Sequence, residues 1–186
     1  MQTQLDISKL LEAGKIANEL EFERALIADR KLRVLSKEDS KYKAVRKKLR
    51  ELISAYEDKN WSSSSRITDK KIQDSDLAEV IAEKESQFIQ KRKDLIRRRL
   101  KSLNLTQQDL GQILGHNSKS YMSELMNGVS PFSLKDLIII NRLLKIELTH
   151  LIPTFLPQAE RTKIKTSIQK LDNPKLRLRE EGFEIA

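Results

Sequence analysis

The chain has 186 residues, of which 38% are hydrophobic and 34% charged, and its formal net charge at pH 7 is +9. Few glycines, prolines and aromatic residues are present, which argues against a sheet protein and predicts an all-α fold. Because the sequence has no cysteine, disulfides, thiolate nucleophiles and cysteine zinc sites are excluded. The basic balance favours a nucleic acid or another polyanion as partner.

Residues 1–60 predict an N-terminal helical domain. We expect a short helix over 8–17 and two longer helices between 19 and 59. In the second of these, apolar residues recur every three or four positions from Tyr42 to Tyr56, as on one face of an amphipathic helix. This module is too small to bury that face alone, so it must pack on the rest of the chain, on a second copy or on another protein.

Residues 61–72 predict a linker, because the four serines of NWSSSSRITDKK (60–71) are followed by mixed charges without a period. A long helical run follows, with Asp74 or Ser75 as its expected cap. We expect one break in this run, between Glu85 and Phe88. Residues 153–186 are expected to form a C-terminal helix, over 157–171, and a tail.

Residues 73–152 predict a five-helix domain with clear start and stop signals. Capping-box patterns occur at 106–109 (TQQD) and at 133–136 (SLKD). Between them, 115–128 (GHNSKSYMSELMNG) predicts a short helix bounded by glycines, with Asn117 or Ser118 as its N-cap.

Two short helices joined by a glycine turn are typical of a helix-turn-helix, in which the second helix lies in the DNA major groove. Gly111 occupies the position where the two helices approach closely, so a larger side chain there would push them apart. The expected shared core consists of Leu110, Ile113, Leu114, Met122 and Leu125.

The segment LTQQDLGQILG (105–115) resembles the opening of the Xre/Cro-type helix-turn-helix family, and 133–152 resembles its closing helices. A second similarity is to HigA-type antitoxins of type II toxin–antitoxin modules. It covers the middle segment, SKSYMSELMNG, and the earlier segment 22–58. The resemblance implies an antitoxin that neutralises a HigB-like, RelE-class ribonuclease toxin and, as a homodimer, represses its own operon at operator DNA. A stand-alone Xre-family regulator without a toxin is the alternative, and an adaptor that no longer binds DNA is a third.

The candidate DNA-binding residues combine the recognition-helix positions implied by the resemblance with neighbouring polar and basic side chains. They are Gln107, Ser118, Lys119, Ser120, Tyr121, Ser123, Glu124, Asn127, Arg97 and Lys101. For Arg97 and Lys101, phosphate contact and a solvated face are equally consistent, and residues 91–93 are expected to be solvated. Relatives often place basic residues where this chain has Glu124, Val129 and Ser130, and a carboxylate repels phosphate.

The candidates for toxin contact, or for packing that supports it, lie on the apolar faces of the N-terminal helices. They are Phe22, Leu26, Tyr42, Val45, Leu49, Ile53 and Tyr56. The basic face around Arg46, Lys47 and Arg50 is a weaker candidate, because RelE-class toxins are typically basic.

No arrangement of residues indicates catalysis, a metal site or a cofactor, so we do not expect an enzyme. His116 and His150 lack a second ligand at metal-binding spacing, and no nucleophile–base pair or glycine-rich phosphate loop is present. Neither a signal core nor an apolar run of membrane-spanning length is found, so a cytoplasmic protein without membrane contact is expected.

Overall fold

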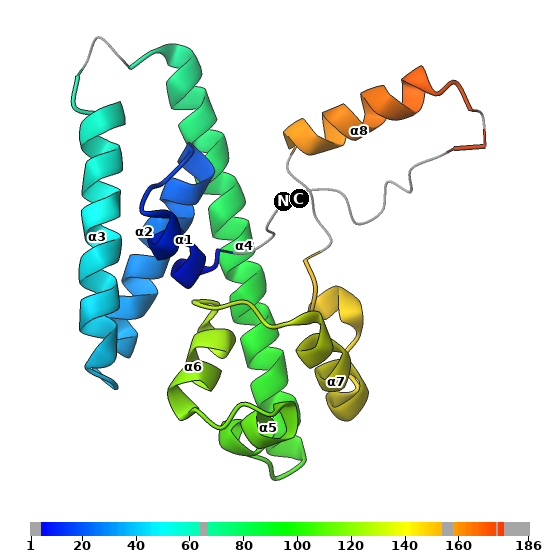
Figure 1. The fold of residues 1–186 in the computed structure, drawn as a ribbon. Coiled ribbons are helices and arrows are strands. Elements are labelled where there is room, and N and C mark those ends of the chain that lie inside the picture. Colours follow the sequence, from blue (N-terminus) through cyan, green and yellow to red (C-terminus); the bar gives the residue numbers. More distant parts are fainter. Residues whose placement is uncertain (1–4, 64–66, 154–157, 174, 177–186) are drawn as a thin grey trace.

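A computed structural model describes residues 5–63, 67–153, 158–173 and 175–176 (Figure 1). Within these ranges every regular element is helical, which confirms the all-α expectation. The helices are α1 (Ile7–Ala13), α2 (Glu19–Leu35), α3 (Lys41–Asn60), α4 (Asp69–Ser102), α5 (Gln107–Leu114), α6 (Lys119–Asn127), α7 (Leu134–Leu144), the 3-10 turn η2 (Leu148–His150) and α8 (Gln158–Lys170).

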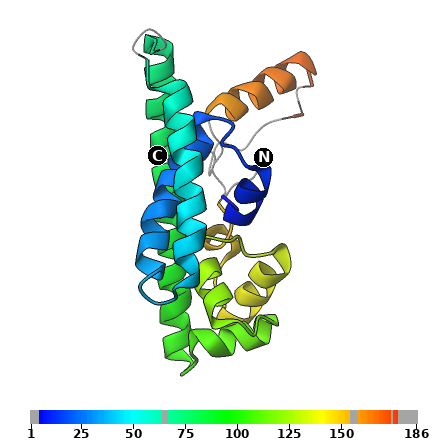
Figure 2. The same cartoon turned by 60° about the vertical axis from the view of Figure 1, so that its left-hand side comes forward.

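The long helix α4 runs the length of the molecule and connects its two parts (Figures 1 and 2). α2 packs against α3 on one side and against α4 on the other. Ala28 of α2 and Ala82 of α4 are both buried beside the same small cavity. Their small side chains let the two helix backbones approach closely, since helix separation depends on the side chains at the contact.

Two expectations about α4 were wrong. The helix begins at Asp69, where the Thr68 hydroxyl accepts a hydrogen bond from the Lys71 amide at 3.3 Å, and not at Asp74 or Ser75. The end of the expected linker is therefore helical. The predicted break between Glu85 and Phe88 is also absent: α4 continues for 34 residues, and it contains no glycine or proline that would kink it.

Two clusters of buried apolar residues form the core. One lies among the C-terminal end of α4, α5, α6, α7 and η2, with Ile96, Leu110 and Ile140 fully buried. The other lies among α1, α2 and α3, and it includes Val129, which follows α6 in the chain. The carbonyl of Val129 also accepts a hydrogen bond from the Ile7 amide at 3.5 Å. The segment after α6 thus joins the N-terminal helices to the C-terminal ones.

α8 lies to one side of the other helices and matches the helix predicted over 157–171 (Figure 1). Ile164 and Ile168 are half-buried. Most of the predicted tail lies outside the described residues.

A buried ion pair connects α2 to α4. The Arg24 guanidinium donates from Nε and Nη2 to the two carboxylate oxygens of Glu85, at 2.6 and 2.5 Å. Both side chains are at most 10% exposed. Burial raises the pKa of Glu85, and the guanidinium opposes that increase. The pair therefore specifies how α2 sits on α4.

Replacing Arg24 with alanine should lower the free energy of unfolding by about 3–5 kcal/mol at neutral pH, because it leaves a buried carboxylate without its partner. Without the guanidinium, the pKa of Glu85 rises further above its value in the unfolded chain, so the protonated form is favoured in the fold. The loss should therefore shrink as the pH falls toward that pKa. Urea denaturation across an acidic pH series measures both effects.

A second substitution, Glu85→Gln in the Arg24→Ala background, should restore part of the stability and remove the pH dependence. If Arg24→Ala alone is as stable as the wild type at every pH, the pair does not hold α2 on α4.

Candidate nucleic-acid interface

α5 begins and ends as its sequence predicts. The Thr106 hydroxyl accepts from the Asp109 amide at 3.1 Å, and the Asp109 carboxylate accepts from the Thr106 amide at 2.7 Å. This reciprocal pairing satisfies two backbone donors at the helix start. Gly115 ends the helix with φ of +82°, a left-handed conformation that glycine adopts without strain.

α6 is the helix expected over 115–128, and it has the expected cap. The Ser118 hydroxyl accepts from the Tyr121 amide at 3.2 Å, and Gly128 ends the helix. Met122 and Leu125 are buried against the C-terminal core. The opposite side of the helix remains for polar contacts.

Gly111 lies at the contact between α5 and α6, as predicted. A Cβ added there would lie 2.7 Å from Met122 Cγ and 2.9 Å from the His116 carbonyl oxygen. The expected core is otherwise found, with one correction. Ile113 is 46% exposed, because it lies on the side of α5 that faces away from α6.

Several candidate DNA-binding side chains converge on one groove. It has a volume of about 800 Å³, and on one wall Arg97, Gln107, Lys119 and Ser123 line it together with Ser120. Arg97, Lys119 and the N-cap Ser118 are exposed. This wall combines ammonium, guanidinium, amide and hydroxyl groups, which are the groups that contact bases and phosphates. Lys101 is exposed nearby on α4 but does not line the groove.

The other wall of the groove is formed by the N-terminal helices, a feature that the sequence did not predict. Glu38, Asp39, Ser40 and Tyr42, from the α2–α3 turn and the start of α3, line it. Two carboxylates thus lie opposite the side chains expected to meet DNA phosphates.

Ser120 and Glu124, two of the predicted DNA contacts, are bonded to this second wall. The Ser120 hydroxyl donates to Asp39 Oδ2 at 2.7 Å. The Tyr42 hydroxyl lies 2.9 Å from the Ser120 carbonyl oxygen and 3.0 Å from Glu124 Oε1, so its proton is shared between them. Lys41 Nζ forms an ion pair with the same Glu124 oxygen at 3.0 Å.

The pKa values of Asp39 and Tyr42 are both shifted at the contact between the two walls. The Lys41 amide and the Ser120 hydroxyl donate to Asp39 and hold its pKa below the usual value. Burial and the neighbouring Glu124 carboxylate raise the pKa of Tyr42, so this phenol keeps its proton and remains a donor.

The three departures from the family pattern share one structural explanation. Glu124 binds Tyr42 and Lys41, and Ser130 donates to Glu124 Oε2 at 3.2 Å. Val129 is buried among the N-terminal helices. Glu124 and Val129 thus attach the helix-turn-helix to the rest of this chain, and Ser130 supports Glu124.

Two other residues lie differently from the expectation. Asn127 accepts from Lys93 Nζ at 2.6 Å and donates to the Ser123 carbonyl at 2.7 Å, so it is held within the protein. Arg92 was expected on a solvated face, but it is buried and donates to the Leu151 carbonyl at 3.1 Å. Burial lowers the pKa of Arg92 to about 10.

Tyr121 is 37% exposed, and its ring meets the His116 ring edge-on at 5.1 Å between centroids. His116 Nε2 in turn lies 3.1 Å from the buried Asp136 carboxylate. His116 is thus a structural residue of the turn, and Tyr121 is partly committed to packing on it.

Most of the apolar residues proposed for toxin contact are buried in the chain's own core. Phe22, Tyr42, Leu49 and Ile53 are each at most 7% exposed, so in this conformation their role is packing. Leu26, Val45 and Tyr56 are half-buried at the edge of the same core.

Comparison with known families places a helix-turn-helix domain at 96–151, from the last turns of α4 to η2. The chain therefore contains an Xre-type helix-turn-helix domain, which supports a DNA-binding transcriptional regulator. The matched segment is less than half of the chain. No curated protein and no solved structure matches the sequence.

Within the described ranges, no group of His, Cys, Asp and Glu side chains could hold a metal ion. None of the helices described is long and apolar enough to cross a membrane.

Replacing Gly111 with valine should lower the free energy of unfolding by about 1–3 kcal/mol, the usual effect of overpacking. The new side chain meets a backbone oxygen that cannot move without displacing the turn. Urea denaturation compares this variant with Gln112→Val, which alters an exposed neighbour on the same helix. If both variants lose the same stability, α5 and α6 are not in close contact at Gly111.

Proposed function

We propose that this chain is an antitoxin that neutralises a HigB-like, RelE-class ribonuclease toxin and represses its own operon by binding operator DNA. The observation that carries the DNA-binding part is the helix-turn-helix domain, with its capped recognition helix α6. The toxin-binding part rests on the resemblance of residues 22–58 and 118–128 to HigA-type antitoxins.

Lys119 and Ser123 are the residues to which we assign base or phosphate contact. Both lie on the groove-facing side of α6, one turn apart, and Lys119 is exposed. Arg97 and Gln107 flank them and suit phosphate contact from the ends of α4 and α5. Ser118 remains available at the helix start, where backbone amides favour phosphate.

DNA and the N-terminal helices compete for α6 in this proposal. Ser120 and Glu124 hold Asp39, Tyr42 and Lys41, and the acidic turn would lie against incoming phosphates. Operator binding thus requires the α2–α3 turn to withdraw, and a partner on the N-terminal helices would change the DNA affinity by moving that turn.

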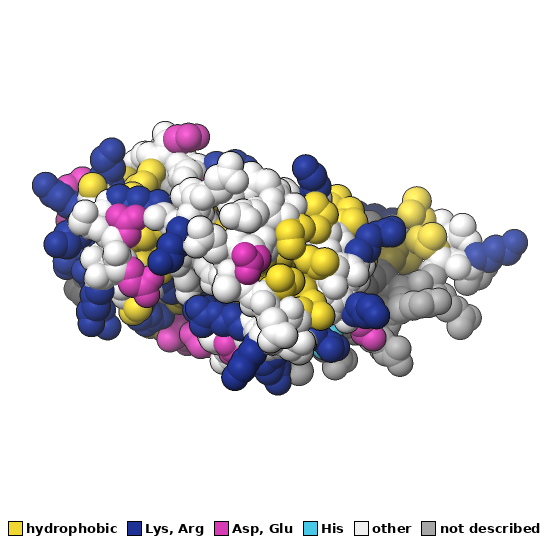
Figure 3. Space-filling model, turned by 90° about the horizontal axis from the view of Figure 1, so that it is seen from below, with side chains coloured by type: hydrophobic (Ala, Val, Ile, Leu, Met, Phe, Trp, Pro, Cys, Tyr) yellow, Lys and Arg dark blue, Asp and Glu magenta, His cyan; other side chains and the backbone are white. Residues whose placement is uncertain are grey.

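A dimer contact is proposed on the outer side of the helix-turn-helix. Figure 3 shows apolar side chains gathered on the end of the molecule formed by the helix-turn-helix. The exposed apolar residues there include Leu134, Ile138 and Ile113, with exposures of 66%, 42% and 46%. Contiguous exposed apolar surface on a monomer marks an interaction site, and a two-fold dimer matches a palindromic operator.

The alternative is a stand-alone Xre-type regulator without a toxin, and the helix-turn-helix is equally consistent with it. Both functions belong to the cytoplasm. They differ only in whether an adjacent gene encodes a toxic partner that the N-terminal helices bind.

The decisive experiment co-expresses the chain with the product of the adjacent gene, with an affinity tag on the partner alone. We expect the chain to restore growth and to be retained with the partner. The double variant Lys119→Glu, Ser123→Glu should be retained equally well but should lose binding to its own upstream DNA, because two carboxylates on the reading side of α6 repel phosphate.

The matched control is Lys163→Glu, Ser167→Glu, which makes the same charge change at the same spacing on α8 and should leave both activities intact. If the product of the adjacent gene is harmless or is never retained, the stand-alone regulator is the function that remains. If the double variant folds but loses both activities together, the division of labour between the two parts is wrong.

A further inference from the structure

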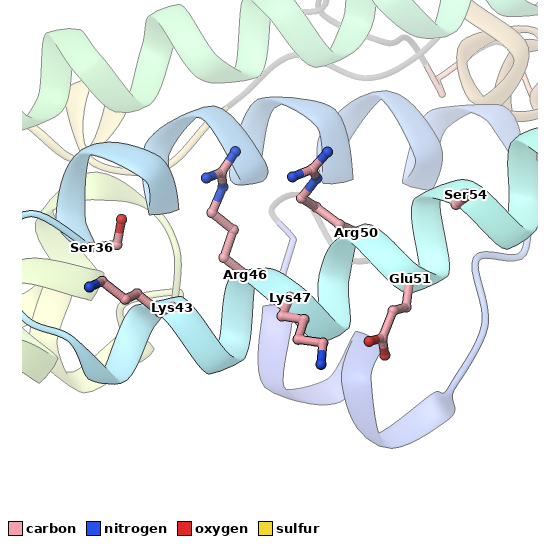
Figure 4. A pocket seen from close by; sticks show the side chains of 7 residues that line it. All are labelled: Ser36, Lys43, Arg46, Lys47, Arg50, Glu51 and Ser54. Carbon is pink, nitrogen blue, oxygen red and sulfur yellow. The ribbon is translucent and has the colours of Figure 1, made fainter.

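A second groove, of about 440 Å³, lies between α3 and the C-terminal end of α2 (Figure 4). Four basic side chains of α3 line it: Lys43, Arg46, Lys47 and Arg50. It is separate from the groove at the recognition helix, with which it shares no lining residue.

The four cations occupy successive turns of one helix. Their spacings are three and four residues, so each lies beside like charges on the adjacent turns. Such pairs oppose helix formation slightly, and a bound polyanion would relieve their repulsion. In Figure 4, Arg46 and Arg50 extend toward α2, while Lys47 lies on the other side of α3 beside Glu51.

Little of this positive charge is neutralised within the chain. Arg46 is oriented by Asp29, which accepts from its Nε at 2.8 Å and from its Nη2 at 3.1 Å. Across the described ranges, Lys43, Lys47 and Arg50 form no ion pair, and Glu51 is the single acid among the lining residues. Figure 3 shows Lys and Arg side chains at the same end of the molecule, with acidic side chains among them.

We propose that this α3 groove binds the phosphate backbone of duplex DNA, outside the contacts made by the recognition helix. Its basic side chains and the hydroxyls of Ser36 and Ser54 are the residue types that contact phosphate. The proposal rests on the proposed DNA-binding function, because the helix-turn-helix already brings a duplex to this chain.

The position of the groove supports duplex DNA over an acidic protein. The α2–α3 turn, residues 36–40, borders both grooves: Ser36 lines one, and Glu38, Asp39 and Ser40 line the other. A duplex held at Lys119 would thus have to extend past this turn to reach Lys43 and Lys47. Phosphates attracted to α3 would also repel the carboxylates of Glu38 and Asp39, and this repulsion favours withdrawal of the α2–α3 turn from α6.

The test measures the affinity of the full chain for a long duplex of scrambled sequence as a function of salt concentration, by fluorescence anisotropy. The variant Lys43→Gln, Lys47→Gln should reduce the slope of log affinity against log salt by about 2, because each phosphate contact contributes about 0.9. The matched control, Lys163→Gln, Lys170→Gln, removes the same charge from exposed positions on α8 and should keep the wild-type slope. Circular dichroism verifies that all proteins are folded.

Binding to the chain's own upstream DNA separates this proposal from the proposed function. If the groove variant keeps the wild-type slope while Lys119→Gln weakens upstream-DNA binding, the groove proposal is wrong and the DNA-binding function stands. If the groove variant has the reduced salt slope but the wild type binds its upstream DNA no more tightly than the scrambled duplex, the groove proposal holds. The proposal of operator recognition then fails. A groove variant that loses binding to a polyglutamate peptide, with no change on duplex DNA, overturns the proposal in favour of an acidic protein partner.

Discussion

The Glu124 carboxylate is the group at which the two parts of the molecule meet. It lies on the recognition helix, accepts from the Tyr42 hydroxyl and Ser130, and pairs with Lys41. A carboxylate that is only partly exposed needs such partners, because its desolvation is otherwise unfavourable. The start of α3 supplies them and is thereby held against α6. The position of the N-terminal helices over the reading surface depends on this contact, together with the burial of Val129.

Much of the helix-turn-helix could be predicted because its determinants are local. The capping boxes at Thr106 and Ser133 and the cap at Ser118 act within three positions, and Gly111 meets its neighbours in the next turn and helix. The helices flanking the reading surface followed from these signals, and the fold class followed from the few glycines, prolines and aromatic residues. The continuity of α4 was missed: the sequence was expected to break between Glu85 and Phe88, although no helix-breaking residue occurs there.

The partners of the reading surface could not be predicted, because they are about 80 positions away in the sequence. An amphipathic face from Tyr42 to Ile53 indicates burial, but it does not say against what. The structure buries Tyr42, Leu49 and Ile53 within the chain itself, which is the packing role that the sequence left open beside toxin contact. The single local signal was Glu124, an acid on a surface expected to be basic, and its partners explain its presence.

The account predicts that the N-terminal helices and DNA compete for α6, and operator affinity tests this directly. The variant Asp39→Ala, Tyr42→Phe removes two hydrogen bonds to α6, each contributing about 1 kcal/mol, and leaves Lys119 and Ser123 intact. It should bind the chain's upstream DNA roughly 30-fold more tightly than the wild type. The control Tyr56→Phe removes a hydroxyl from the same core away from α6 and should leave the affinity unchanged. Equal or weaker binding by a folded Asp39→Ala, Tyr42→Phe variant would contradict the account, because it would mean that these contacts do not oppose DNA binding.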